Sequence, residues 1–201
     1  MEENSVAIRV ATPADAQALR DIYAPYVKNT AITFEYEVPS VPEFTERLRT
    51  VSERYPYLVA EADGEVLGFT YGSAFVGRRA YDWSVETSIY VKQYMRKKGV
   101  GRALYRALEQ VLIAQGFTNM NACISYPKGG VDDEFLTTNS VGFHEHLGFE
   151  MVGRFNQCAY KFGRWYDMVW MERMIAEHRE NQPEVIPFSQ IADSVPQILA
   201  Q

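Results

Sequence analysis

Residues 91–102 read Val91-Lys92-Gln93-Tyr94-Met95-Arg96-Lys97-Lys98-Gly99-Val100-Gly101-Arg102. They lie between a predicted strand over 84–91 and the best-patterned helix of the chain, which begins at Val100 and ends at Gly116. The first turn of a helix has backbone N–H groups without internal partners, and the helix dipole adds positive charge there. Since glycines let a ligand approach closely, this basic segment predicts a pyrophosphate cradle.

A solvated basic turn before a surface helix is the alternative for this segment. The spacing differs from that of a Walker loop, which needs Gly-Lys-Ser/Thr after a longer glycine spacing, and from Gly-x-Gly-x-x-Gly. These differences argue against nucleoside triphosphatases and dinucleotide-binding enzymes.

The segments on either side predict one mixed α/β domain with the element order βααβββαβαββ. Expected strands cover 6–10, 57–62, 66–75, 84–91, 120–124, 151–160 and 165–174, and expected helices cover 12–26, 40–55, 100–115 and 139–146. We expect the domain to span residues 1–175. The tail, 176–201, is polar and interrupted by prolines, and its apolar patch at 185–188 is expected to pack on the domain or on a neighbouring subunit.

Composition indicates an ordinary globular protein. The 201 residues are 47% hydrophobic and 23% charged, and the net charge of −6 argues against a nucleic-acid partner. No apolar stretch reaches the roughly 18 residues of a membrane helix. The acidic start, Met1 to Asn4, lacks the features of a signal peptide, so we expect a cytoplasmic protein with no membrane partner.

The two cysteines, Cys123 and Cys158, are expected to be reduced, buried structural residues. Together with His144 and His146 they lack the spacing of zinc ligands, so we expect no metal site.

The motif Arg96-x-x-Gly99-x-Gly101 after a strand resembles the coenzyme A motif of the GNAT superfamily of N-acetyltransferases, and the element order resembles that fold over about residues 5–175. The resemblance implies a central mixed, mostly antiparallel sheet flanked by helices, and acetyl-coenzyme A as co-substrate. It also implies that the pyrophosphate is held by residues Arg96, Lys97, Lys98, Gly99, Val100, Gly101 and Arg102. The pantetheine arm would pair with Ile89, Tyr90 and Val91.

Three longer blocks, at 80–91, 143–149 and 161–167, are similar to the phosphinothricin acetyltransferase group, which includes enzymes acting on methionine sulfone and methionine sulfoximine. This closer resemblance implies a small-molecule amine as substrate and a homodimer.

Glu86 is the candidate general base, because an amine attacks a thioester only after losing a proton. Alternation along the strand places Val85, Thr87, Ile89 and Val91 on a core face, and Ser84, Glu86, Ser88 and Tyr90 on a polar face. A partly desolvated carboxylate there would have a raised pKa. The alternative is a solvated glutamate on an exposed face, but the subgroup's glutamate falls on this position.

His144 is the second catalytic candidate, on a short helix one turn before Gly148. The subgroup has a histidine at this position, and imidazole can act as acid or base near neutral pH. A helix histidine with a purely structural role is the alternative.

Substrate recognition rests on the resemblance. Arg78 matches the subgroup's substrate-binding arginine, Tyr81 its tyrosine and Phe34 a pocket-wall phenylalanine; surface charge and ordinary core packing are the alternatives. Phosphinothricin enzymes carry a lysine where this chain has Val76. A less acidic amine is therefore expected to fit better.

The link over 126–138 is longer than usual and carries Asp132, Asp133 and Glu134. It is expected to act as a lid or to repel anionic substrates. The family's coenzyme A-contacting asparagine would fall on Thr137, so Asn139 is expected to substitute for it.

Three hypotheses follow. The chain is a small-molecule amine acetyltransferase, or it acetylates protein N-termini or lysines, or it is a non-catalytic acyl-coenzyme A-binding module. Arg78 favours the first over the second, and the presence of both Glu86 and His144 argues against the third.

Overall fold

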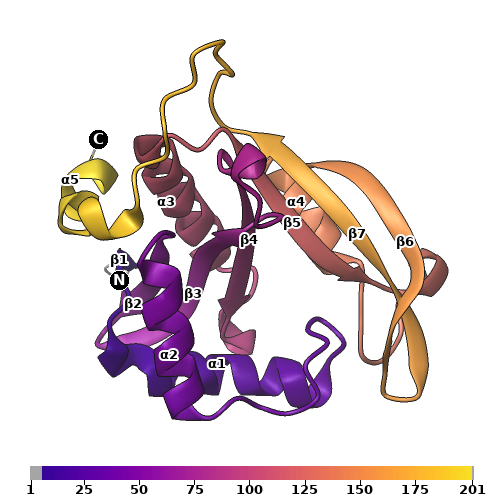
Figure 1. Ribbon diagram of the computed structural model, residues 1–201. Helices are drawn as coiled ribbons and strands as arrows, with labels where there is room; N and C mark the ends of the chain where they lie inside the picture. The colour runs from indigo at the N-terminus through magenta and orange to yellow at the C-terminus, as the bar shows by residue number, and fades with distance from the viewer. Residues whose placement is uncertain (1–5, 201) are drawn as a thin grey trace.

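Two layers of helices enclose a seven-stranded sheet in the computed structural model, which describes residues 6–200 (Figure 1). The strands are β1 (Ala7–Val10), β2 (Tyr57–Ala62), β3 (Glu65–Ala74), β4 (Ser84–Val91), β5 (Asn119–Tyr126), β6 (Glu150–Lys161) and β7 (Arg164–Met174). The helices are α1 (Ala16–Asn29), α2 (Val41–Ser52), α3 (Val100–Gln115), α4 (Asn139–His146) and α5 (Val195–Leu199). The acidic start, Met1 to Asn4, lies outside the described residues.

The predicted element order is confirmed, with α5 as an addition. The helix expected to stop near Tyr26 continues to Asn29, because Tyr26 and Val27 still face the core. α2 begins as its sequence indicates: Ser40 and Glu43 form a reciprocal capping box.

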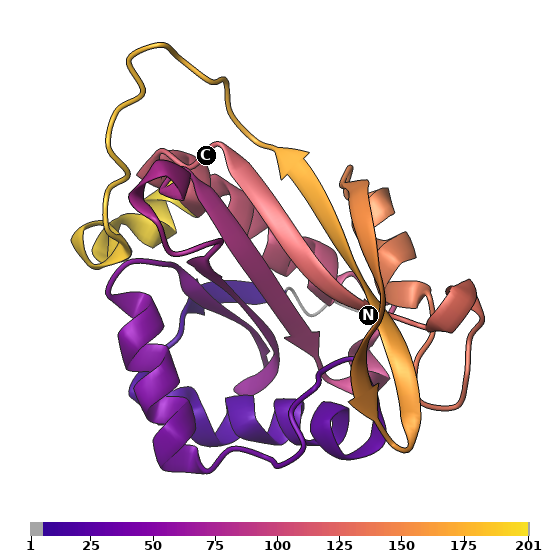
Figure 2. The ribbon, with the colours of Figure 1, turned by 45° about the vertical axis from the view of Figure 1, so that its right-hand side comes forward.

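The strand order β1-β2-β3-β4-β5-β7-β6 is antiparallel except at β4 and β5, which confirms the expected mixed, mostly antiparallel sheet. β4 and β5 run parallel and pair only from Ser84 to Glu86, against Asn119 to Asn121. Beyond that point the two strands diverge (Figure 2). The gap exposes main-chain edges in the middle of the sheet.

Each sheet face has its own apolar core. α1 and α2 cover one face through a cluster that includes Tyr23, Phe44 and Phe69. α3 covers the other face with Leu108 and Leu112, at the helical spacing expected from the sequence. Each fully buried leucine contributes about 2 kcal/mol to folding. α3 is thereby fixed against the sheet, and its residue Tyr105 lines the gap.

The C-terminal segment packs on the domain. Phe188 and Val195 are buried in the same core as α3. The Gln115 amide donates to the carbonyl of Ile186 at 2.7 Å, and the indole N–H of Trp83 donates to the carbonyl of Pro183 at 2.6 Å. The apolar patch at 185–188 therefore contacts its own chain, mainly through Phe188. The C-terminal segment that follows, with α5, lies beside α3 (Figure 1).

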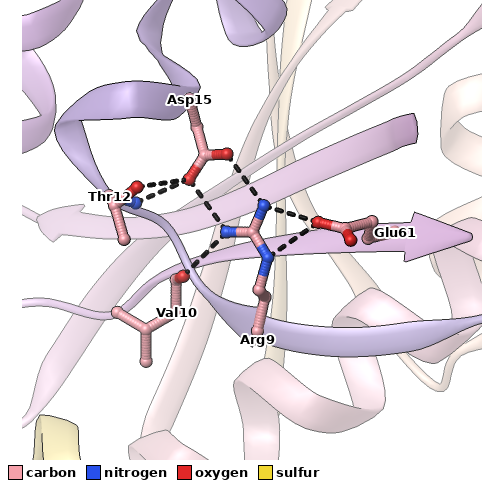
Figure 3. Close-up of polar contacts among 5 residues, drawn as sticks. All are labelled: Arg9, Val10, Thr12, Asp15 and Glu61. Carbon is pink, nitrogen blue, oxygen red and sulfur yellow. Dashed lines mark hydrogen bonds and ion pairs between the residues drawn. The ribbon is translucent and has the colours of Figure 1, made fainter. Parts of the chain in front are cut away.

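Arg9 on β1 joins the first strand to the first helix (Figure 3). Its guanidinium donates to Asp15 at 2.8 and 2.9 Å and to Glu61 on β2 at 2.6 and 2.8 Å. The Asp15 carboxylate also accepts from the backbone N–H of Thr12 at 2.7 Å. Hydrogen bonds from Arg9 hold the pKa of Asp15 below its ordinary value.

Asp15→Ala should lower the free energy of unfolding by about 2 kcal/mol at neutral pH, because it leaves Arg9 and the Thr12 N–H without their acceptor. A lowered folded-state pKa contributes stability above the unfolded pKa of about 3.9 and loses it as pH falls further. The difference between wild type and variant should therefore shrink below about pH 4. Urea unfolding measures it, with exposed Asp21→Ala as control; an equal loss in both variants would contradict this role.

Candidate active site

The gap between β4 and β5 is a cleft in the structure. Its lining comes from β4, β5, α3, α4 and the loop after α1: Ile32, Thr87, Ser88, Ile89, Tyr90, Tyr105, Ala122, Cys123, Ile124, Ser125, Ser140 and His144. Of the predicted site residues, the cleft brings together Ile89, Tyr90 and His144. Tyr105, Thr87, Ser125 and Ile32 also line it, and none of them was predicted from the sequence to have a role in the site.

Glu86 lies on β4 opposite Ser73 of β3, just where the pairing with β5 ends. Its side chain is half-buried, and burial raises the pKa of Glu86 above its ordinary value. Within residues 6–200 its carboxylate forms no ion pair or side-chain hydrogen bond. It is therefore a desolvated acid with free lone pairs beside the cleft.

His144 on α4 is 3% exposed. Its Nδ1 lies 2.7 Å from the carbonyl of Ser140, which can only accept, so Nδ1 carries the proton. The bare Nε2 then accepts from the hydroxyl of Tyr105 at 2.9 Å. Burial lowers the pKa of His144 to about 4, so the ring is neutral at neutral pH.

Tyr105 connects this histidine to the floor of the cleft. Its hydroxyl lies 3.3 Å from Thr87 Oγ1, and Thr87 in turn donates to the carbonyl of Asn121 at 3.0 Å. A tyrosine one turn into the helix that follows the basic loop was the signal available in the sequence. Tyr105 directly follows Leu104 of the apolar stripe, so its place in the sequence predicts a core residue and gives no sign of a role in the cleft.

The basic loop has the backbone that an anion cradle requires. Lys97 and Gly99 have φ of 61° and 86°, and the hydrogen bonding of α3 begins with the Ala103 N–H, which donates to the Gly99 carbonyl at 3.0 Å. The N–H groups of the first turn before Ala103 are thus free to meet a ligand. Lys97, Lys98 and Arg102 are exposed around them. The Arg96 guanidinium lies 5.1 Å from the Tyr26 ring centroid.

Val100 and Gly101 in the basic loop also contribute to packing. The Val100 side chain is buried in the core. A Cβ at Gly101 would lie 3.1 Å from the Phe143 ring, so this glycine allows α3 and α4 to approach. A larger residue at 101 would thus press on α4 before it reached a bound anion. Val100 and Gly101 can contribute main-chain donors to a ligand.

The polar face expected for β4 is only partly polar. Ser84, Glu86 and Ser88 are half-buried, but the Tyr90 ring packs edge-on against Tyr23 at 4.8 Å, because α1 covers this part of the face. The strand end is occupied too. The Val91 N–H donates to the Tyr26 hydroxyl at 3.3 Å, and that hydroxyl donates to the Val91 carbonyl.

The predicted substrate residues lie outside the cleft lining. Phe34 packs near Tyr166 at a ring distance of 6.3 Å. Arg78 and Tyr81 are exposed at a turn before β4. The Phe75 ring contacts both Tyr81, at 6.0 Å, and Trp170 on β7, at 5.3 Å. Phe34 thus contacts β7 at Tyr166, and Tyr81 reaches the same strand through Phe75 at Trp170.

The acidic insertion is anchored to its surroundings. Asp133 accepts from the backbone N–H groups of Phe135 and Leu136 at 2.8 and 2.9 Å and pairs with Arg164 at 3.3 Å. Leu136 is buried. Much of the charge is therefore compensated locally. Asn139, the expected cofactor asparagine, is exposed at the start of α4.

The prediction of buried cysteines is wrong, since Cys123 and Cys158 are both exposed and unpaired. Alternation along β5 places Ala122 and Ile124 in the core and turns Cys123 to the opposite face, where it lines the cleft. Partial burial raises the pKa of the Cys123 thiol to about 11.

Within residues 6–200, no three His, Cys, Asp or Glu side chains are grouped so as to hold a metal ion. Over the same residues, no helix combines the length and apolar character needed to cross a membrane.

Comparison with known proteins gives a consistent result. Residues 8–170 match the family model of the acetyltransferase (GNAT) domain. The chain is 36% identical to the phosphinothricin N-acetyltransferase of Streptomyces viridochromogenes, with 86% of this chain and 89% of the relative covered. It is 39% identical to the L-methionine sulfoximine/L-methionine sulfone acetyltransferase of Pseudomonas aeruginosa, with 84% and 94% covered.

Among solved structures, it is similar to a GNAT superfamily phosphinothricin acetyltransferase from Sinorhizobium meliloti in complex with AcCoA. The TM-score is 0.78 at 34% identity, and the match covers 91% of this chain and 98% of that one.

His144 should remain neutral and Nδ1-protonated from about pH 8 down to about pH 5, because burial opposes the charged ring and Ser140 fixes the tautomer. Long-range ¹⁵N–¹H NMR distinguishes the two ring nitrogens, and loss of its signals in His144→Gln assigns them. A titration midpoint near the ordinary value of about 6.5 would show that the ring is solvated.

Proposed function

Since the chain belongs to the GNAT acetyltransferase family, we propose that it moves an acetyl group from acetyl-coenzyme A to the amine of a small amino-acid-like substrate. The observation that supports this most is the junction of three features. A cleft opens between β4 and β5, and beside it lies the half-buried carboxylate of Glu86, which has no partner among residues 6–200. A basic loop whose first-turn N–H groups are open within the same described range lies where β4 leads into α3.

For the cofactor, we propose that the first-turn N–H groups of α3 hold the pyrophosphate, with Lys97, Lys98 and Arg102 adding Coulombic attraction. The pantetheine arm would follow β4 along Ile89 to Val91, where β5 no longer pairs, and would replace the Tyr26 hydroxyl at the main-chain groups of Val91. Asn139, exposed at the start of α4, faces solvent and is free to contact coenzyme A.

For the chemistry, we propose that Glu86 accepts the proton that the substrate ammonium must lose. The free amine nitrogen then forms a bond to the thioester carbonyl carbon, and the carbon–sulfur bond breaks. The sulfur leaves as a thiolate and takes up the second proton, which the nitrogen releases as it becomes an amide. His144 is neutral, so it is not the imidazolium donor for that step. Its Nε2 instead orients the Tyr105 hydroxyl, which lines the cleft.

For the substrate, the names of the relatives point to phosphinothricin, methionine sulfoximine and methionine sulfone. We propose that Arg78 pairs with the substrate carboxylate and that Tyr81 and Phe34 contact its side chain. Val76, 48% exposed, stands where a cation would pair with an acidic side chain. A neutral side chain, as in the methionine derivatives, therefore suits this chain better than a phosphinate.

We also propose a homodimer in the cytoplasm. The edge strand β6 exposes Met151, Val152 and Phe155, a pattern that favours coverage by another chain. Both cysteines are unpaired, as in a reducing compartment.

Glu86→Gln should lower kcat by about 100-fold at neutral pH while the affinity for acetyl-coenzyme A stays unchanged, because only proton removal is lost. The raised pKa of Glu86 means that wild-type turnover rises with pH as the carboxyl ionises, and the variant should lose this dependence. Thiol release and thermal shift with acetyl-coenzyme A measure the two effects. Glu172→Gln, a half-buried glutamate on β7, is the matched control. Unchanged kcat in Glu86→Gln would remove Glu86 as the base.

An amine panel tests the substrate proposal: phosphinothricin, methionine sulfone, methionine sulfoximine, polyamines and short peptides. We expect kcat/KM for methionine sulfone to exceed that for phosphinothricin by about tenfold. Val76→Lys should shift this ratio about tenfold toward phosphinothricin, because the added ammonium can pair with the phosphinate.

Val131→Lys, at an exposed valine in the insertion, should leave the ratio unchanged. Turnover of peptides alone would favour a protein acetyltransferase. Tight acetyl-coenzyme A binding with no turnover of any amine would favour a binding module.

A further inference from the structure

The loop between α1 and α2 forms one wall of the cleft. Ile32 lines the cleft, and its carbonyl accepts from the hydroxyl of Ser125, another lining residue, at 3.2 Å. Phe34 follows two residues later in the same loop. The position of this loop therefore sets the shape of the wall that faces β4.

A buried lysine holds the loop from behind. Lys161, the last residue of β6, is 2% exposed. Its Nζ donates to the carbonyl of Thr30 at 2.9 Å and to the carbonyl of Thr33 at 2.7 Å. These two carbonyls bracket Ile32, so one ammonium fixes the backbone on both sides of the residue that enters the cleft.

Burying the Lys161 ammonium costs solvation free energy, so the two hydrogen bonds that it donates are expected to contribute something that an apolar residue could not. Lys161 forms no ion pair with any carboxylate in residues 6–200, so its charge is stabilised mainly by the two carbonyl dipoles, with the Phe162 ring centroid 5.0 Å from Nζ and Glu35 acting at longer range. Burial of such a group lowers the pKa of Lys161 below its ordinary value. An apolar residue could fill the same volume without the desolvation penalty, but it could not fix the two carbonyls.

Further bonds tie the same loop to the same neighbours. The Tyr36 hydroxyl donates to the carbonyl of Tyr160, the residue before Lys161. The N–H of Ala31 donates to the carbonyl of Phe135 in the insertion at 3.0 Å. The hairpin of β6 and β7 thus holds both ends of the loop segment 30–36, which crosses the cleft wall.

We propose that Lys161, assisted by Tyr36, is a positioning residue that holds loop 30–36 in the shape required to bind the amine substrate. The assignment of that wall to the amine rests on the proposed function. Lys161 acts through Ile32 and Phe34 and has no contact with the reacting atoms. Loss of the ammonium frees the two carbonyls and lets the wall move away from β4.

Lys161→Met tests this, because methionine keeps most of the volume and removes the donors. We expect amide hydrogen exchange in segment 30–36 to become about tenfold faster in the free protein. KM for the preferred amine should rise about tenfold, while the Kd of acetyl-coenzyme A stays within about twofold. Lys128→Met, at an exposed lysine in the insertion, should change none of these.

Tyr36→Phe provides a second test at an exposed position where folding is not at risk. It should raise the amine KM by about threefold with the same split from acetyl-coenzyme A binding. Unchanged exchange and KM in both variants would overturn the proposal. An equal loss of affinity for the amine and for acetyl-coenzyme A would also overturn it, because such a loss indicates a structural role only. The exchange measurement needs no turnover. An inactive wild type would therefore contradict the proposed function, whereas the role of Lys161 in holding loop 30–36 would still be decided by the exchange rates.

Discussion

The early end of the pairing between β4 and β5 is the constraint on which the site depends. Two parallel strands that part after three residues leave main-chain donors and acceptors open inside a protein, where each needs a partner. Side chains supply some of them. Thr87 donates to the Asn121 carbonyl, and Tyr26 bonds to both polar groups of Val91. What remains open is a slot between the two strands, which α3 borders at Tyr105.

Burial in this slot acts on the two titratable groups in opposite senses. It raises the pKa of Glu86 and lowers the pKa of His144, because in each case the charged form loses its solvation. The acid thereby becomes a better proton acceptor than an exposed glutamate, and the histidine becomes a fixed, neutral hydrogen-bond acceptor. Desolvation thus favours proton acceptance at Glu86 and a fixed hydrogen bond at His144.

The sequence predicted the order of the elements and the basic loop because local signals specify them. Period-two and helical patterns, Asp63-Gly64 and Gly116 leave little freedom. It predicted Glu86 and His144 as candidates through resemblance. It could not predict that Tyr105 meets His144, that Lys161 reaches Thr30 and Thr33, or that Cys123 is exposed. Those facts depend on which distant strand or loop lies opposite, and spacing along the chain carries no information about that.

The packing of the C-terminal segment limits how far the chain can be truncated without removing part of its core. The family match ends at residue 170, within β7, yet Phe188 and Val195 complete the core beneath α3. Gln115, at the far end of that helix, is bonded to the carbonyl of Ile186. A fragment trimmed to the matched range would lose the last residues of β7 and the core side chains of Phe188 and Val195. The hydrophobic core of this protein therefore extends beyond the range that the family model matches.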